Sequence, residues 1–327
     1  MRPNAVVLCT DATLFPVAMF VAQRLAALKA RDDTDIIVFA SSADNVASVV
    51  NAGLPFEVRL AERPAGLAPG LMREATFLRF FALETLTERR RVLYLDTDVY
   101  PENAALFALF DLAMSGRALA AVRDLVIAHA PDASERSATV GGDSRLYFNA
   151  GVLLIDIVAY RRQELYAKVV RFLGRQRTAP RFFDQSALNA ILRGDWVELS
   201  PSFNMMVALW RSALRRVFDP VVVHFAGTLK PWMGPRFAID HPARQEIEAY
   251  LLNSPWKAFL AQQFGLRDAL ALVGGGLRQA PTGSSADLNF DSDFIGRPAF
   301  LRHLRHTEFA DVQQGITTPH WEYFPPA

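Results

Sequence analysis

The feature that most constrains this chain is the stretch from Arg91 to Tyr100, with the sequence RVLYLDTDVY. Val92 to Leu95 are apolar and favour a β-strand without polar interruption, which is typical of a strand covered by helices on both faces of a sheet. The apolar run ends in Asp96 and Asp98. Ligands of open α/β sheets bind beyond the carboxyl ends of the strands, so these two carboxylates stand where a functional site is expected.

Two carboxylates one residue apart repel each other, and a bound divalent cation relieves that repulsion. Hard oxygen ligands of this kind suit Mg²⁺ or Mn²⁺ that is held together with substrate phosphates. The alternative is a turn at the end of the strand in which Asp98 caps the next helix. Asp96 and Asp98 alone fit both interpretations.

Strand patterns and helix patterns alternate along the chain, and this alternation predicts an α/β fold with a mostly parallel, Rossmann-like sheet flanked by helices. The predicted strands cover 5–9, 36–40, 56–60, 92–95, 119–122, 146–157, 196–199 and 221–224. The predicted helices cover 15–28, 44–51, 71–86, 103–112, 158–173, 183–193, 241–252 and 255–273.

The composition excludes several classes of protein. The 35 basic and 34 acidic residues leave a net charge of +1, so we expect no nucleic-acid partner. The single cysteine, Cys9, cannot form an intrachain disulfide and fits a reducing, cytoplasmic compartment. The sequence shows no signal peptide, because Asp11 interrupts the first apolar stretch, and it shows no segment long and apolar enough to span a bilayer.

Polar residues also interrupt three other apolar segments. Asn149 and Gly151 stand inside the strongly apolar stretch LYFNAGVLLIDI, where a β-bulge or the close approach of a ligand is the usual reason. Arg79 lies on an otherwise apolar helix face, where it either snorkels to solvent or binds a phosphate or carboxylate. Asp184 is either the N-cap of its helix or part of a site.

A second strand, VVVHFAGTLKPW from Val221 to Trp232, also ends in polar residues. A neutral imidazole at His224 is a suitable partner for carboxylates on a cation such as Mn²⁺. Gly227 leaves the backbone free to approach a ligand, and Lys230 could neutralise a phosphate. Together with Asp96 and Asp98, these residues predict a site for a cation and a diphosphate.

Four segments, LYLDTDV, YFNAGVLLID, FDQSALN and HFAGTLKPW, occur in an order and at a spacing that resemble the family 8 retaining glycosyltransferases. That family includes bacterial lipopolysaccharide galactosyltransferases and glucosyltransferases and also glycogenin. The resemblance implies a GT-A fold, a UDP-sugar donor and a catalytic Mn²⁺, with Mg²⁺ as the alternative. It assigns the cation to Asp96, Asp98 and His224.

The resemblance also implies a role for residues around the cation. Asn149, Asp184 and Gln185 would line the donor sugar and the reacting face, and Asp124 would lie near the acceptor. The remaining donor contacts that it implies are Asp11 near uracil and ribose, Arg79, Asp96 and Thr97 on the donor, and Gly227 and Lys230 on the diphosphate.

These expectations combine in one functional hypothesis, a Mn²⁺-dependent hexosyltransferase that moves glucose or galactose to a glycan or another hydroxyl acceptor. Retention could proceed through a covalent intermediate on Gln185 or Asp184, or along a front-face path in which UDP helps to deprotonate the acceptor, and the front-face path asks less of the protein. Two alternatives are a catalytically silent protein that binds sugar nucleotides and a nucleotidyltransferase, which would release pyrophosphate rather than UDP. The alanine- and arginine-rich composition is typical of bacteria and favours a cell-surface glycan of the lipopolysaccharide type as acceptor.

We predict a catalytic domain over residues 1–250 and a helical, aromatic-rich extension over residues 251–327. Aromatic and basic side chains are mixed after residue 290. They predict packing onto the catalytic domain or a homodimer contact, and alternatively peripheral attachment to the anionic surface of the inner membrane.

Overall fold

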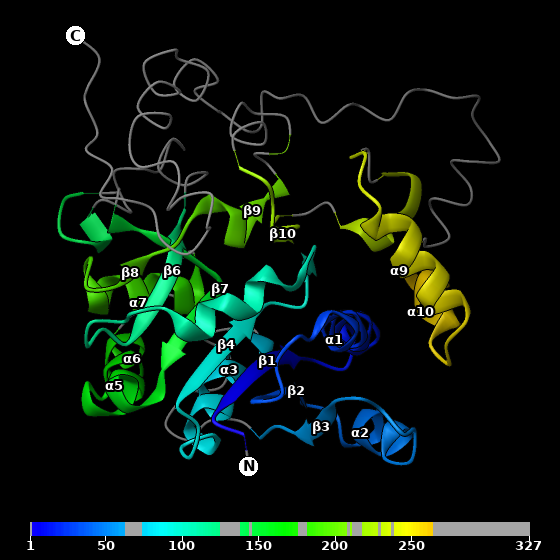
Figure 1. Ribbon diagram of the computed structural model, residues 1–327, viewed down its shortest axis with the longest axis horizontal. Coiled ribbons are helices and arrows are strands. Elements are labelled where there is room, and N and C mark those ends of the chain that lie inside the picture. Colours follow the sequence, from blue (N-terminus) through cyan, green and yellow to red (C-terminus); the bar gives the residue numbers. More distant parts are fainter. Residues whose placement is uncertain are drawn as a thin grey trace, which may run out of the picture.

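A computed structural model describes residues 2–62, 74–124, 138–143, 146–175, 182–207, 210, 218–227, 230–236 and 239–263. These residues form two sheets with helices around them (Figure 1). No helix in the described part of the chain has both the length and the apolar character needed to cross a membrane.

The main sheet contains seven strands within the described residues, in the spatial order β3-β2-β1-β4-β7-β6-β8. β3, β2, β1 and β4 run parallel to one another, as do β6 and β8, whereas β7 lies antiparallel to both β4 and β6. The predicted α/β fold with a mostly parallel sheet is therefore confirmed, with one reversed strand inside it. The strands are β1 (Asn4–Thr10), β2 (Thr34–Ala40), β3 (Glu57–Leu60), β4 (Arg91–Leu95), β6 (Leu119–Arg123), β7 (Phe148–Asp156) and β8 (Val197–Glu198).

Helices cover both faces of this sheet and bury an apolar layer on each. The strands supply both layers by alternation: Leu93 and Leu95 of β4 point into one layer, and Tyr94 points into the other. The first layer packs against α1 (Phe15–Leu28), α2 (Ala43–Val49), the 3₁₀ helix η1 (Ala104–Asp111), α9 (Ala243–Leu252) and α10 (Lys257–Gln263). The second packs against α3 (Glu74–Thr85), α5 (Ile157–Arg162), α6 (Leu165–Gly174) and α7 (Phe183–Leu192).

Two predicted helices differ in the structure. A single helix over 158–173 is wrong, because the chain breaks between α5 and α6 at Glu164, whose φ of 51° is left-handed. This break re-aims the chain so that α6 buries Leu165, Val169 and Leu173 against the sheet. The helix predicted over 103–112 is present as the 3₁₀ helix η1.

A small second sheet lies beside the carboxyl end of β4. It contains β5 (Val99–Pro101), β10 (Val222–His224) and β9 (Met205–Met206), in the order β5-β10-β9, within the described residues. β10 runs antiparallel to β5 and pairs His224 with Val99, the residue that follows Asp98. The second sheet thereby carries His224, which is distant in sequence, to the end of β4. The short 3₁₀ helices η4 (Pro201–Asn204) and η6 (Pro231–Arg236) flank it in the chain.

The last described helices belong to the same core as the sheet. Leu251 of α9 and Phe259 of α10 are buried in the layer that contains Phe15 of α1, and the ring of Phe15 meets that of Trp256 edge-on at 5.7 Å between centroids. The predicted domain boundary at residue 250 therefore falls within α9. Residues 264–327, which carry most of the predicted extension and its basic and aromatic segment, lie outside the described residues.

Candidate active site

The carboxyl ends of β1 and β4 lie side by side and form the edge on which the site is built. Leu8 of β1 is paired with Leu95, the last residue of β4, and β1 continues to Thr10 at the same edge. Asp11 follows β1 and Asp96 follows β4 at this edge. The edge that the sequence predicts for a ligand is thus formed by two neighbouring parallel strands.

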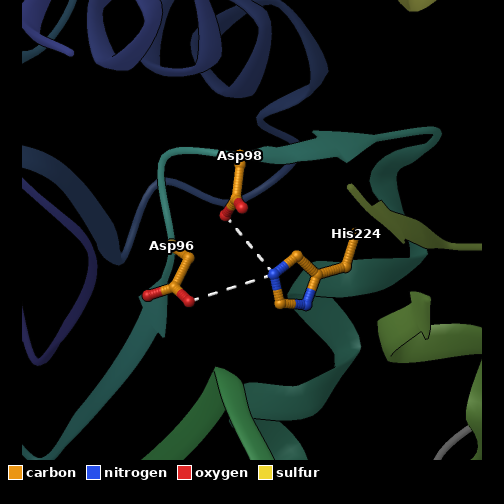
Figure 2. A group of neighbouring side chains, drawn as sticks. All are labelled: Asp96, Asp98 and His224. Carbon is orange, nitrogen blue, oxygen red and sulfur yellow. Dashed lines mark ion pairs between the residues drawn. The ribbon is translucent and has the colours of Figure 1, made fainter. Parts of the chain in front are cut away.

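Asp96, Asp98 and His224 converge at this edge (Figure 2). His224 Nε2 lies 3.3 Å from Asp98 Oδ1 and 3.9 Å from Asp96 Oδ2. One ligand atom from each residue lies within 4.8 Å of the others. The imidazole is buried and both carboxylates are partly exposed, so the cluster opens to solvent on the side of the acids. The alternative in which Asp98 caps the next helix is wrong, because Asn103 caps η1 instead.

Charge interactions within this cluster shift two pKa values in opposite directions. Burial alone would raise the pKa of Asp98, but the neighbouring His224 and Lys230 outweigh burial and hold the pKa well below its usual range. Burial would lower the pKa of His224, and the nearby Asp98 and Asp96 outweigh it and raise the pKa. Both pKa shifts have the same cause, the attraction between the carboxylates of this cluster and the positive charges beside them.

Arg79 ties α3 to the end of β4 and to α7. Its guanidinium donates to the Ala150 carbonyl at 2.7 Å and to Asp96 Oδ1 at 3.1 Å, and its Nε lies 2.8 Å from Asp184 Oδ2 as an ion pair. Tyr94 donates its hydroxyl to the same Asp96 oxygen at 2.7 Å. Arg79 is therefore buried and binds carboxylates, as one of the predicted alternatives had it. Its predicted contact with the UDP-sugar remains a prediction.

Asp184 is buried within the first turn of α7 and is not its N-cap, which is Phe182. Burial outweighs the attraction of Arg79 and raises the pKa of Asp184 to about 6. The folded protein therefore holds this proton more tightly than the unfolded chain, and the stability that Asp184 contributes falls as the pH rises through about 6.

We expect the stability of the wild-type protein relative to Asp184→Asn to increase by up to about 3 kcal/mol as the pH falls from about 7 to about 4. Asparagine cannot titrate, so the difference between the two proteins isolates this one carboxyl group. Urea unfolding of both proteins across this range measures it. A difference that does not change with pH would contradict the raised pKa.

A hydrogen-bonded amide network joins Asn149, Asp124 and Gln185 beside the cluster. Asn149 Nδ2 and Gln185 Nε2 both donate to Asp124 Oδ2, at 3.3 and 3.2 Å, and Gln185 Oε1 accepts from the Ala150 N–H at 2.9 Å. Asn149, Asp184 and Gln185, predicted for the donor sugar, and Asp124, predicted for the acceptor, thus lie within two connected sets of contacts around β7. Their roles toward a sugar remain predictions.

The Asn and the Gly inside β7 now have a structural reason. The pairing between β6 and β7 jumps from Ala121–Leu153 to Val122–Asn149, so residues 150–152 form a bulge opposite β6. At Gly151 a side chain would also collide with the imidazole of His224, because a Cβ would lie 2.2 Å from its Cε1 atom. The predicted bulge is confirmed, and the close approach is made by a side chain of the protein itself.

The remaining predicted residues lie around the cluster. Lys230 Nζ forms an ion pair with the Asp98 carboxylate and donates to the Phe225 carbonyl at 2.7 Å. Its charge is therefore paired with Asp98 in this structure. Gly227 has a left-handed φ of 103°, a conformation that favours glycine, and a Cβ added there would meet no atom within 4 Å.

Asp11 Oδ1 accepts from the Leu14 N–H at the start of α1. Thr97, which stands between the two acids in the sequence, is buried.

Two residues of the site are not among those that the sequence predicts. Tyr94 supports Asp96 from the buried strand β4, and Asn204 contacts His224 Nδ1 at 2.9 Å. A signal existed for Asn204, because it is a buried amide within the otherwise apolar stretch Phe203 to Met206. Buried amides are hydrogen-bonded, so an isolated one in an apolar segment indicates a specific partner.

The fold places the protein among GT-A glycosyltransferase structures. The galactosyltransferase LgtC, solved in complex with donor and acceptor sugar analogues, matches it with a TM-score of 0.65 at 23% identity, over 78% of this chain and 99% of that one. Residues 62–234, more than half of the chain, match the model of glycosyl transferase family 8. The chain therefore belongs to glycosyltransferase family 8, as the resemblance of its motifs predicts.

Sequence relatives lie in bacteria. General stress protein A of Bacillus subtilis (strain 168) is 31% identical over 181 residues, which cover 51% of this chain. The lipopolysaccharide 1,2-glucosyltransferase of Escherichia coli (strain K12) is 27% identical over 197 residues, 56% of this chain. The matches span only 60% and 55% of these relatives' own lengths. The family match includes each predicted site residue except Asp11.

Proposed function

We propose that the protein is a retaining hexosyltransferase that moves glucose or galactose from a UDP-sugar to a hydroxyl group of a glycan. Asp96, Asp98 and His224 would hold the cation, Mn²⁺ or alternatively Mg²⁺. The observation that carries this proposal is the convergence of their three ligand atoms within 4.8 Å at the carboxyl edge of the sheet.

The charge and the chemistry of the cluster fit a divalent cation. The carboxylates of Asp96 and Asp98 both face the imidazole of His224 at this edge. A divalent ion between them would relieve the repulsion between the two acids. Two carboxylate oxygens with one imidazole nitrogen suit Mn²⁺, which accepts both kinds of ligand.

The chain would bind the donor through residues that already surround the cation. When bound, the cation would supply positive charge for the leaving diphosphate. Lys230 would turn from Asp98 to the diphosphate, Gly227 would leave room for it, and Thr97 would lie against it. Asp11, at the neighbouring strand end, would bind the uridine. Electrostatic groups preorganised in this way commonly provide the largest single catalytic contribution. One hydrogen-bond donor of this kind lowers the activation free energy by about 3–4 kcal/mol.

The contacts of Asp184 and Gln185 favour the front-face path over a covalent intermediate. Asp184 is buried against Arg79 and accepts backbone N–H bonds, and Gln185 Oε1 accepts from the Ala150 N–H. A nucleophile needs an oxygen that can leave such contacts and reach the sugar. In the front-face path these residues only position the sugar, with Asn149, while a phosphate oxygen of the donor receives the acceptor proton.

Glucose and galactose are proposed as the transferred sugars because the relatives include a glucosyltransferase and a galactosyltransferase by name. The first of these is named for lipopolysaccharide, which supports a glycan acceptor of that type, with Asp124 near the acceptor. The balanced charge supports a role without nucleic acid. We propose a cytoplasmic location, with the basic and aromatic segment after residue 290 providing contact with the inner membrane or with a second copy of the chain.

A panel of UDP-sugars tests this function. With Mn²⁺ and no acceptor, we expect slow hydrolysis of UDP-glucose or UDP-galactose, release of UDP, and loss of this activity on addition of EDTA. Release of pyrophosphate would identify a nucleotidyltransferase. Binding of a UDP-sugar without turnover, with or without a glycan acceptor, would identify a catalytically silent protein.

A further inference from the structure

The direction of a hydrogen bond deep in the site is fixed by the backbone. The N–H of Gly151 donates to Asn149 Oδ1 at 2.9 Å, and a backbone N–H can only donate. This atom of Asn149 is therefore the amide oxygen. Asn204 lies 2.8 Å from the same oxygen and must present its NH₂ group to it. The carbonyl oxygen of Asn204 consequently points the other way, toward His224.

The orientation of Asn204 determines which nitrogen of His224 carries hydrogen. Asn204 Oδ1 lies 2.9 Å from His224 Nδ1, and an amide oxygen can only accept, so Nδ1 is the protonated nitrogen. In the neutral ring the lone pair is then on Nε2. Nε2 faces carboxylate oxygens of Asp98 and Asp96, and these acceptors repel one another unless a cation or a proton lies between them.

Burial makes this arrangement rigid. Asn204 and His224 are 1% and 3% exposed, so water does not compete for the hydrogen bond between them. The backbone of Gly151 lies against the ring closely enough that a Cβ would be only 2.7 Å from Nδ1. The imidazole is thus confined by Gly151 and oriented by Asn204.

We propose that Asn204 is a positioning residue that holds His224 in the Nδ1–H form and aims Nε2 at the cation. Partners of this kind, which bond to the second nitrogen of a metal-binding histidine, fix its tautomer and orientation. The inference rests on the proposed function, in which the cluster holds a divalent cation.

Mn²⁺ binding by the metal-free full-length protein, followed through the free-ion signal in electron paramagnetic resonance, tests the proposal. We expect Asn204→Ala to weaken Mn²⁺ binding by about 10-fold to 100-fold. Asn204→Asp keeps an oxygen acceptor for Nδ1 and should stay within about threefold of wild type, although it loses the bond to Asn149 and buries a charge. A merely structural role for Asn204 predicts the reverse order, because the aspartate harms the fold at least as much as the alanine.

Asn189 provides a matched control. It is also a buried asparagine beside β7, and it bonds to the backbone of Phe148 and to the Gln185 carbonyl without contacting His224. We expect Asn189→Ala to lower the melting temperature and to leave Mn²⁺ affinity within about threefold of wild type. Equal loss of affinity in Asn189→Ala and Asn204→Ala would overturn the specific role of Asn204.

The tautomer itself is measured without any activity. Long-range ¹H–¹⁵N spectra of the metal-free protein with labelled histidine, recorded above the pKa of the imidazole, should show hydrogen on Nδ1 of His224, identified by its absence in His224→Gln. Hydrogen on Nε2 would overturn the inference even if Asn204→Ala fails to fold. If the wild type binds no Mn²⁺, the proposed cation site fails. If it binds and Asn204→Ala binds equally well, only the role of Asn204 fails.

Discussion

Replacing Asp98 with asparagine is expected to abolish Mn²⁺ binding and to lower UDP-sugar turnover by about a thousandfold. Asp98 is the carboxylate closest to His224 Nε2, at 3.3 Å, and the partner of Lys230. The substitution removes one ligand of the proposed cation and also releases the lysine and the imidazole from their common anion. Three contributions to the site therefore fail together, although the side chain hardly changes in size.

The fold is expected to survive this change. The Asp98 side chain is partly exposed, and its backbone carbonyl still accepts from the Phe225 N–H at 2.9 Å, which keeps β10 beside β5. Circular dichroism and melting temperature check this point. Asp195→Asn is the control, since Asp195 is an exposed carboxylate paired with Arg117 on the surface and should be replaceable without loss of turnover. Undiminished turnover by Asp98→Asn in the presence of EDTA would contradict the proposed role of the cation.

The fold was predictable because a strand that is buried on both faces has an uninterrupted apolar sequence. β1 and β4 are apolar without interruption, and helical patterns lie between the strands, so the α/β class followed directly. The direction of β7 did not follow. A strand buried on both faces has the same apolar sequence whether its neighbours run parallel or antiparallel, so the reversal depends on how the chain returns to the sheet.

The site was predictable where a polar residue interrupts an apolar run. Asp96 follows β4, Asp98 precedes β5 and His224 ends β10, and they converge because β10 pairs with β5 directly after the two acids. The contacts of Arg79 and Lys230 were harder to predict. Each side chain had several charged partners in prospect, and only the three-dimensional structure pairs Arg79 with Asp184 and Lys230 with Asp98.

Gly151 shows why a residue without a side chain can be as informative as a ligand. The sequence predicted a bulge or a close approach at this position, but it could not name what approaches. The answer is the imidazole of His224, which arrives from the second sheet through the pairing of β10 with β5. The space that glycine leaves at β7 is therefore part of the proposed cation site.

Gly151→Ala is expected to weaken Mn²⁺ binding by about 100-fold and to lower the free energy of unfolding by about 1–3 kcal/mol. The added Cβ would lie 2.2 Å from His224 Cε1, so the ring or the strand has to move. A moved ring loses its alignment with Asp98 and with Asn204. Metal titration and urea unfolding measure the two effects separately. Wild-type values for both would show that the ring has more room than the structure gives it.

A double-mutant cycle with His224→Ala isolates the collision. In the His224→Ala background the imidazole is gone, so Gly151→Ala should lower the free energy of unfolding by less than about 0.5 kcal/mol, a coupling of about 1–3 kcal/mol between the two positions. Gly174→Ala is the matched control, because Gly174 ends α6 and an added Cβ there meets no atom within 4 Å. It should change stability by no more than about 0.5 kcal/mol. An equal loss of stability from Gly151→Ala in both backgrounds would place its cause in the bulge of β7 rather than in the contact with His224.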